Sequence, residues 1–143
     1  MKIVINTCYG GFGLSPEGQK EYLEKKGKKA YFYTQTKYKH RDKVEEYERV
    51  DTLEDKTLLH HTFTFTEDLG KVTSKLPGQE VWFFDFDIDR TDPDLIAVIE
   101  KLGEKANGRC AELSIIEIPD GIEWGIYNYD GIESVEEKHR SWN

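Results

Sequence analysis

Apolar residues follow two different periods along the chain, and these periods predict where strands and helices lie. Ile3, Val4 and Ile5 form a continuous β-branched run inside Lys2–Cys8, which predicts a strand buried on both faces. Shorter apolar or alternating runs predict further strands at Ala30–Thr34, Leu59–Phe65, Val81–Asp89, Ala111–Ile118 and Trp124–Tyr129. Proline, glycine and aspartate separate the later runs and mark the turns between them.

Two helices are predicted by their capping residues. Ser15 is a suitable N-cap, a proline follows it, and Gly27 closes a helix over residues 16–26. Asp92, again followed by proline, begins the most strongly patterned helix of the chain, and Asn107–Gly108 ends it. Shorter helical segments are predicted at Val44–Val50 and in the tail, Ile132–Trp142.

These elements predict a chain in which helices and strands are mixed. The expected class is α/β, with α+β left open, and the expected architecture is one mixed β-sheet with two or three packed helices. A length of 143 residues is near the modal size of a domain, so we expect residues 1–143 to form a single domain. Hydrophobic residues make up 37% and charged residues 34%, which favours a folded domain over a disordered chain.

Charge and composition restrict the partners of the chain. The formal net charge is −8, which disfavours binding to long nucleic acid because that binding needs a basic face. A few arginines around a pocket can still bind a small anion, since salt screens more distant charges over about 8 Å. No apolar run approaches the roughly 20 residues that cross a bilayer. We therefore expect no membrane partner, a cytoplasmic location, and two cysteines kept as reduced thiols.

A glycine-rich loop follows the first predicted strand and precedes the first helix. Gly10, Gly11 and Phe12 lie where backbone N–H groups and a helix N-terminus can meet a phosphate. The loop has neither the Gly-Lys-Ser/Thr ending of nucleotide triphosphatases nor the third glycine of the dinucleotide motif. A tight turn and a ligand contact are therefore both open interpretations.

Carboxylates alternate along the strand that is predicted to end at Asp89. Asp85 and Asp87 resemble the Asp-x-Asp motif of the haloacid dehalogenase superfamily, in which one carboxylate attacks phosphorus and both approach magnesium. Ile88 stands where that motif has threonine or valine, and the motif normally lies on the first strand. We therefore favour a solvent-facing row of carboxylates and keep a metal-dependent phosphohydrolase as an alternative.

Arg90 and Arg109 lie at opposite ends of the helix that begins after Asp92. One chain cannot easily bring them together, whereas an antiparallel homodimer would set Arg90 of one subunit against Arg109 of the other. A role for both arginines in surface ion pairs is equally open.

Three segments of the chain resemble a small phage-encoded protein: Lys2–Ser15 at the start, Asp92–Ile96 in the middle and Glu137–Trp142 at the end. Over its whole length the chain is similar to the first family of Thoeris anti-defence proteins, which bind cyclic ADP-ribose signals made by bacterial TIR enzymes. The resemblance implies that the signal is held intact in the host cytoplasm. It therefore implies no catalytic residue, no cofactor and no metal.

The resemblance also implies a homo-oligomer with pockets near the subunit contacts. In such pockets aromatic rings stack on the base and arginines hold the phosphates. On this chain the resemblance implies Phe83 or Phe84 as the stacking group. It implies Arg90 and Arg109 as phosphate partners, and Asp92 as a contact to ribose or base.

Three classes of function are therefore open from the sequence. We favour a protein that sequesters a cyclic nucleotide immune signal without cleaving it. The alternatives are a phosphohydrolase that uses Asp85 and Asp87, and an accessory protein that acts by binding a host protein.

Overall fold

The computed structural model describes residues 1–39, 44–50, 62–73 and 83–138. The helices are α1 (Pro16–Lys25) and α2 (Pro93–Leu102), with short 3-10 helices η3 (Asp85–Asp87) and η4 (Gly103–Ala106). The strands are β1 (Lys2–Asn6), β2 (Tyr31–Lys39), β3 (Val44–Val50), β4 (Thr62–Phe65), β5 (Val72–Thr73), β6 (Leu113–Glu117), β7 (Trp124–Tyr129) and β8 (Ile132–Glu137).

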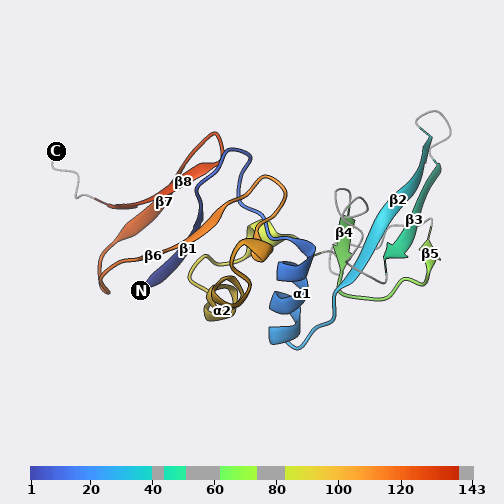
Figure 1. Cartoon of the computed structure of the whole chain (residues 1–143), viewed down its shortest axis with the longest axis horizontal. Coiled ribbons are helices and arrows are strands. Elements are labelled where there is room, and N and C mark those ends of the chain that lie inside the picture. The colour runs from blue at the N-terminus through green and yellow to red at the C-terminus, as the bar shows by residue number, and fades with distance from the viewer. Residues whose placement is uncertain (40–43, 51–61, 74–82, 139–143) are drawn as a thin grey trace. The chain divides into compact units, whose positions relative to one another are not determined.

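The chain divides into two compact units (Figure 1). The first unit contains Met1–Gly18 and the chain from Asp85 onward, and the second contains Gln19–Phe84. The predicted mixture of helices and strands is confirmed, whereas the single domain expected from chain length stays a prediction. In place of one mixed sheet, the described strands form three sheets whose pairings are antiparallel.

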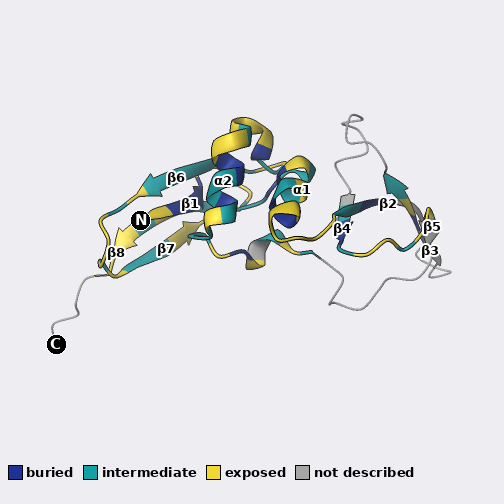
Figure 2. Ribbon diagram, turned by 90° about the horizontal axis from the view of Figure 1, so that it is seen from below, coloured by how far each residue is buried: buried dark blue, intermediate teal, exposed yellow. Residues whose placement is uncertain are grey.

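β1 is a buried strand of the first unit. It pairs antiparallel with β6, so that Asn6 at its end lies opposite Leu113. Helix α2 packs against both strands, and Figure 2 shows buried residues on the helix and on β1. The buried hydrophobic side chains of these two elements are Ile3, Val4, Ile5, Leu95, Val98 and Ile99. Removing each such side chain from water stabilises the fold by about 1.5–3 kcal/mol.

The edge of β1 that faces away from β6, its second edge, is hydrogen-bonded to two residues from elsewhere in the first unit. The Val4 N–H donates to the carbonyl oxygen of Arg90 at 2.9 Å. The Asn6 N–H donates to the Glu133 carboxylate at 2.8 Å, and Glu133 belongs to β8, which lies beside β1. The backbone of β1 is thus hydrogen-bonded on both sides, as a buried strand requires.

The tail of the chain forms strand β8, so the helix predicted for Ile132–Trp142 is wrong over its described part. β7 and β8 pair antiparallel along their length. Asp130 and Gly131 connect them with φ values of +51° and +90°, as a two-residue type I′ turn requires. Asp-Gly between two strand-like segments is a strong hairpin signal, and the cross-strand bonds it creates decide the structure of the tail.

Segment Val44–Val50 is strand β3, so the short helix predicted there is also wrong. It pairs with β2 from Val44 opposite Lys39 to Val50 opposite Phe32. A helix of seven residues is marginal by itself, because nucleation costs more than so few bonds return. The neighbouring strand supplies the hydrogen bonds that this segment could not make alone.

The second unit is built on a four-stranded sheet in the order β4, β2, β3, β5. One buried cluster of this unit contains Tyr33, Tyr47 and Phe65, against which Tyr31, Phe63 and Leu69 pack. The Tyr33 hydroxyl donates to the Gly70 carbonyl at 2.7 Å and accepts from the Leu69 N–H at 2.9 Å. Burial raises the pKa of this hydroxyl, which therefore stays protonated and fixes the turn after β4.

Both helices begin at the capping residues that the sequence predicts. The Ser15 hydroxyl accepts from the Gly18 N–H at 3.1 Å, and the Asp92 carboxylate accepts from the Asp94 N–H at 2.9 Å. α2 ends earlier than predicted, at Gly103, which has a φ of +57°. The 3-10 helix η4 carries the chain onward from there.

The hairpin turn gives a test of the fold. A Cβ added at Gly131 would lie 2.4 Å from the backbone nitrogen of Gly11, and the φ of Gly131 is already positive. We expect Gly131→Ala to lower the free energy of unfolding by about 3–5 kcal/mol, from overpacking and backbone strain together. Urea denaturation followed by circular dichroism measures the change.

Gly121 is the matched control, because it has a φ of +82° and no atom within 4 Å of an added Cβ. Gly121→Ala should cost only the conformational strain, about 1–2 kcal/mol. Equal losses for the two variants would show that the contact between the turn and Gly11 contributes nothing.

Candidate functional site

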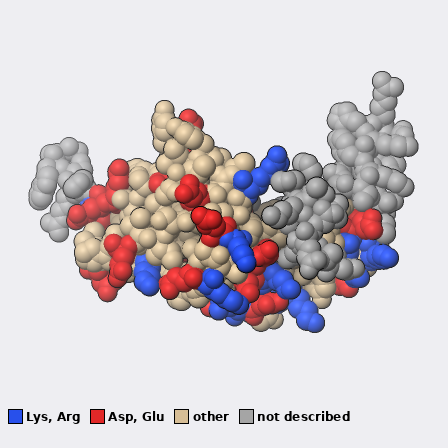
Figure 3. Space-filling model, viewed as in Figure 1, with Lys and Arg blue, Asp and Glu red and all other residues tan. Residues whose placement is uncertain are grey.

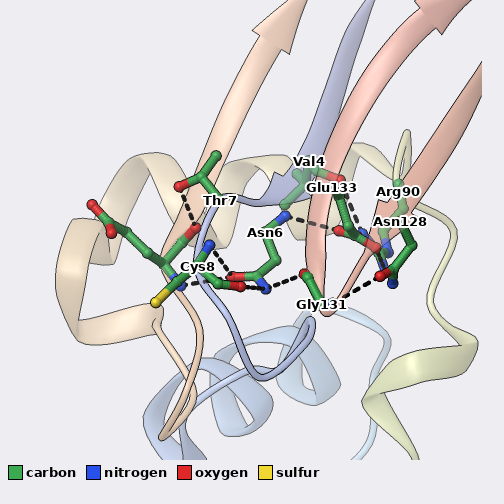
Figure 4. Close-up of polar contacts among 9 residues, drawn as sticks. Val4, Asn6, Thr7, Cys8, Arg90, Asn128, Gly131 and Glu133 are labelled. Carbon is green, nitrogen blue, oxygen red and sulfur yellow. Dashed lines mark hydrogen bonds and ion pairs between the residues drawn. The ribbon is translucent and has the colours of Figure 1, made fainter.

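Asn6 connects the end of β1 to three other segments (Figure 4). Its side chain is fully buried. The amide nitrogen donates to the carbonyl oxygens of Cys8 and Gly131, both at 2.7 Å. The amide oxygen accepts from the Glu112 N–H at 2.8 Å. One side chain therefore joins β1, the loop after it, the β7–β8 turn and the segment before β6.

Arg90 and Glu133 form a buried ion pair beside this junction. The guanidinium donates to the two carboxylate oxygens at 2.6 and 2.9 Å, and the side chains are only 16% and 5% exposed. The guanidinium also lies 3.6 Å from the centroid of the Phe12 ring, which is a cation–π contact. Arg90 and Phe12, both predicted to contact a ligand, are thus bound to each other and to an internal carboxylate.

The glycine loop packs closely on the segment between η4 and β6. A Cβ built on Gly10 would lie 2.4 Å from the Cβ of Cys110, and one on Gly108 would lie 2.8 Å from the carbonyl carbon of Gly13. The Gly108 N–H donates to the Gly13 carbonyl at 2.9 Å. Gly10 and Gly11 have φ values of +113° and +93°. Close packing and backbone conformation therefore explain these glycines without a ligand.

A cleft of about 530 Å³ opens beside this contact, within the first unit. Its size lies in the range of roughly 300–1,000 Å³ that is usual for small-molecule sites. Arg109, Glu104 and Glu112 are its charged lining residues, and Ile99 and Leu113 contribute apolar surface. Arg109 is exposed and makes no ion pair with any residue that the structure describes.

Of the ligand contacts predicted from the sequence, Arg109 alone is among the described residues that line this cleft. Arg90 is bound to Glu133, and the Asp92 carboxylate is the N-cap of α2. Of the loop residues, Gly10 packs against Cys110, a lining residue next to Arg109, and the Phe12 ring packs on Arg90. The two arginines thus have different surroundings: one is buried and paired, and the other faces solvent in a cleft.

Phe83 and Phe84 belong to the second unit, whereas the cleft belongs to the first. Phe83 is half-buried and its ring lies 6.0 Å from that of Tyr22. Phe84 is 37% exposed. Tyr9, which directly follows a cleft residue and is 64% exposed, is an aromatic group that the sequence reasoning did not single out. A stacking role for Phe83 or Phe84 stays a prediction.

The predicted strand with a row of aspartates is wrong within its described part, because η3 covers Asp85–Asp87. The Asp85 carboxylate accepts from the Leu14 N–H at 2.9 Å. The Asp89 carboxylate accepts from the Thr91 N–H at 2.8 Å and from its hydroxyl at 2.7 Å, and these bonds hold the pKa of Asp89 below its usual range. Two of the carboxylates thus bond to nearby backbone and do not alternate along a strand.

Sequence reasoning missed Asn6 and Glu133. Asn6 had a signal, because it is a polar residue that ends a run of buried β-branched residues. For Glu133 the sequence offers no such signal, because its side chain points toward β1 only when residues 132–137 form a strand of the hairpin and not a helix.

No family model, no curated protein and no solved structure matches this chain. Within the described residues, no helix is long and apolar enough to cross a membrane. The same part of the chain holds no group of three or more His, Cys, Asp or Glu side chains placed to bind a metal ion. On the face of the first unit seen in Figure 3, acidic and basic side chains are interspersed.

The ion pair gives a test that separates a structural role of Arg90 from ligand binding. Arg90→Ala leaves the Glu133 carboxylate buried without a counter-charge, so we expect the free energy of unfolding to fall by about 3–5 kcal/mol. The backbone N–H of Asn6 donates to that carboxylate, so its hydrogen exchange should become faster. Urea denaturation and amide exchange of the ligand-free protein measure both effects.

Lys2→Ala is the control for this test, because Lys2 forms a half-exposed pair with Glu100 in the same unit. It should change the stability by no more than about 1 kcal/mol. If Arg90→Ala left stability unchanged, the ion pair would have no structural role and Arg90 would again be a candidate ligand contact.

Proposed function

We propose that this chain is a binding protein that holds a small cyclic nucleotide, of the cyclic ADP-ribose type, without cleaving it. The observation that carries the proposal is the exposed guanidinium of Arg109 in a cleft of small-molecule size. Arginine binds phosphate through two parallel, charge-assisted hydrogen bonds. Among the described residues, Arg109 has no carboxylate partner that it would first have to release.

The other cleft residues narrow the chemistry of the ligand. Glu104 and Glu112 can accept hydrogen bonds from sugar hydroxyls, and Ile99 and Leu113 offer apolar surface to a base. Two carboxylates beside one guanidinium disfavour a compact, highly charged anion such as free phosphate. A ligand that spreads few phosphates among hydroxyls and a flat ring matches this lining better.

The biological role rests on the resemblance to Thoeris anti-defence proteins. That resemblance supports a phage protein that sequesters an immune signal in the host cytoplasm, as a homo-oligomer. An intersubunit site built from Arg90 and Arg109 would have to break the buried pair of Arg90 with Glu133. We therefore retain Arg109 as the phosphate partner.

Arg109→Ala tests the site directly. Loss of a bidentate phosphate contact should weaken binding by about 2–3 kcal/mol, or roughly 30- to 150-fold, with the fold unchanged. Arg109→Lys should restore little of this, because a point charge cannot replace the planar fork. Isothermal calorimetry with cyclic ADP-ribose isomers measures the affinity, and heating the complex afterwards recovers the ligand for mass spectrometry.

Lys105→Ala is the matched control, because it removes a nearby exposed cation that does not line the cleft. The Lys105→Ala variant should bind cyclic ADP-ribose isomers with the same affinity as the unaltered chain. Equal losses for the Arg109 and Lys105 variants would point to a diffuse charge effect, and a cleaved product would show that the protein is an enzyme.

The phosphohydrolase alternative has its own test. Because the Asp85 carboxylate bonds the Leu14 backbone and Asp87 is exposed on η3, we expect Asp85→Asn and Asp87→Asn to leave nucleotide binding nearly unchanged. Calorimetry and a phosphatase assay with magnesium measure the two properties. Magnesium-dependent hydrolysis that either substitution abolishes would overturn the binding-protein proposal.

A protein partner is favoured by one separate observation. Tyr127 and Tyr129 on β7 are 49% and 75% exposed and, two residues apart, lie on the same face of the strand. Exposed tyrosines are common at protein interfaces. If no cyclic nucleotide binds, this strand is the surface to examine by cross-linking to host proteins.

A further inference from the structure

We propose that Cys8 and Cys110 form a modification site: a dithiol that a peroxide oxidises to an intramolecular disulfide at the wall of the Arg109 cleft. They are the only two cysteines of the chain and lie 102 positions apart in its sequence. Both nevertheless line the same cleft, and both thiols are free.

Backbone hydrogen bonds bring the two cysteine segments together. The Thr7 N–H donates to the Glu112 carbonyl at 2.8 Å. The side-chain oxygen of Asn6 accepts from the N–H groups of both Cys8 and Glu112, at 3.3 and 2.8 Å. Cys8 is one residue beyond Thr7 and Cys110 is two residues before Glu112, so these hydrogen bonds hold the backbone next to both cysteines.

The glycine loop that follows Cys8 also contacts Cys110, through Gly10. A Cβ on Gly10 would lie 2.4 Å from the Cβ of Cys110, so the chain that leaves Cys8 runs directly against Cys110. A disulfide requires Cβ atoms about 3.5–4.5 Å apart, and we expect the close packing of these two segments to allow Cys8 and Cys110 to reach that separation. In Figure 4 the Cys8 sulfur lies on the side of the network away from Arg90, outside the buried ion pair.

The exposure of the two thiols assigns their order of reaction. Cys110 is exposed and meets the peroxide first, whereas Cys8 is half-buried. The Cys110 thiol gives up its proton and its sulfur attacks one peroxide oxygen. The O–O bond breaks, a sulfenic acid forms, and the departing hydroxide takes up the proton to give one water. The Cys8 thiol then attacks the sulfenic sulfur, the S–S bond forms, and the S–O bond breaks to release a second water. Two thiols are oxidised and one peroxide is reduced.

The disulfide would fix the wall of the cleft next to Arg109. If the proposed nucleotide binding holds, oxidation should therefore change the affinity, and this consequence rests on that proposed function. The disulfide itself needs no ligand to be observed. Failure of the bond and failure of nucleotide binding are consequently separate results.

The experiment treats the reduced, full-length protein with a small excess of hydrogen peroxide and then alkylates the remaining thiols. Mass spectrometry under denaturing conditions should show a monomer that has lost two hydrogen atoms and carries no alkyl group. Dithiothreitol should return both alkylation sites. Peptide mapping without reductant should show the peptide of Cys8 joined to that of Cys110.

The single variants are the controls. In Cys8→Ser, oxidation should stop at the sulfenic acid of Cys110, which dimedone traps. In Cys110→Ser, Cys8 should stay alkylatable much longer after peroxide treatment than the two thiols of the unaltered chain do. Two thiols that stay alkylatable after peroxide would overturn the proposal. So would disulfide-linked dimers, or independent oxidation of each cysteine to a sulfinic acid.

Discussion

The first unit depends on how the second edge of β1 is hydrogen-bonded. A buried N–H without an acceptor costs about 1–3 kcal/mol, and no strand ladder covers this edge at Val4 and Asn6. The Glu133 carboxylate accepts from Asn6, but a buried carboxylate needs a positive partner. Arg90 supplies that charge through its side chain and accepts from Val4 through its carbonyl. β1, the Glu133 carboxylate and Arg90 therefore stabilise one another, and each needs the others to complete its hydrogen bonds or its charge pairing.

Close backbone approaches extend this arrangement to the cleft. The ion pair fixes β8 beside β1, which places Gly131 of the hairpin turn against the nitrogen of Gly11. The glycine loop in turn lies against Cys110, next to Arg109. A side chain at Gly131 or at Gly10 would push these segments apart, so glycine at these two positions is needed for the contact and not only for the turn. Gly10 and Gly131 thus help to position the wall of the cleft at Cys110, although neither of them lines the cleft.

Local signals in the sequence predict a large part of this fold. The N-caps Ser15 and Asp92 and the buried run of β1 are confirmed, because each depends on neighbouring residues only. Segment Val44–Val50 was predicted wrongly, since its apolar spacing is compatible with a helix and only pairing with β2 makes it a strand. The pairing of Arg90 with Glu133 could not be predicted, because it requires the hairpin to be placed on β1 first.

The different surroundings of the two arginines limit what each can do. A ligand phosphate that bound Arg90 would have to replace Glu133, and a buried carboxylate left without its partner costs about 3–5 kcal/mol. That penalty is comparable to or larger than the roughly 1.5–3 kcal/mol that a charged hydrogen bond contributes, so such an exchange is unfavourable. Arg109 is exposed in the cleft and has no carboxylate partner among the described residues, so it can bind a phosphate without this penalty. Binding at the cleft can therefore proceed while the ion pair that holds β1 stays intact.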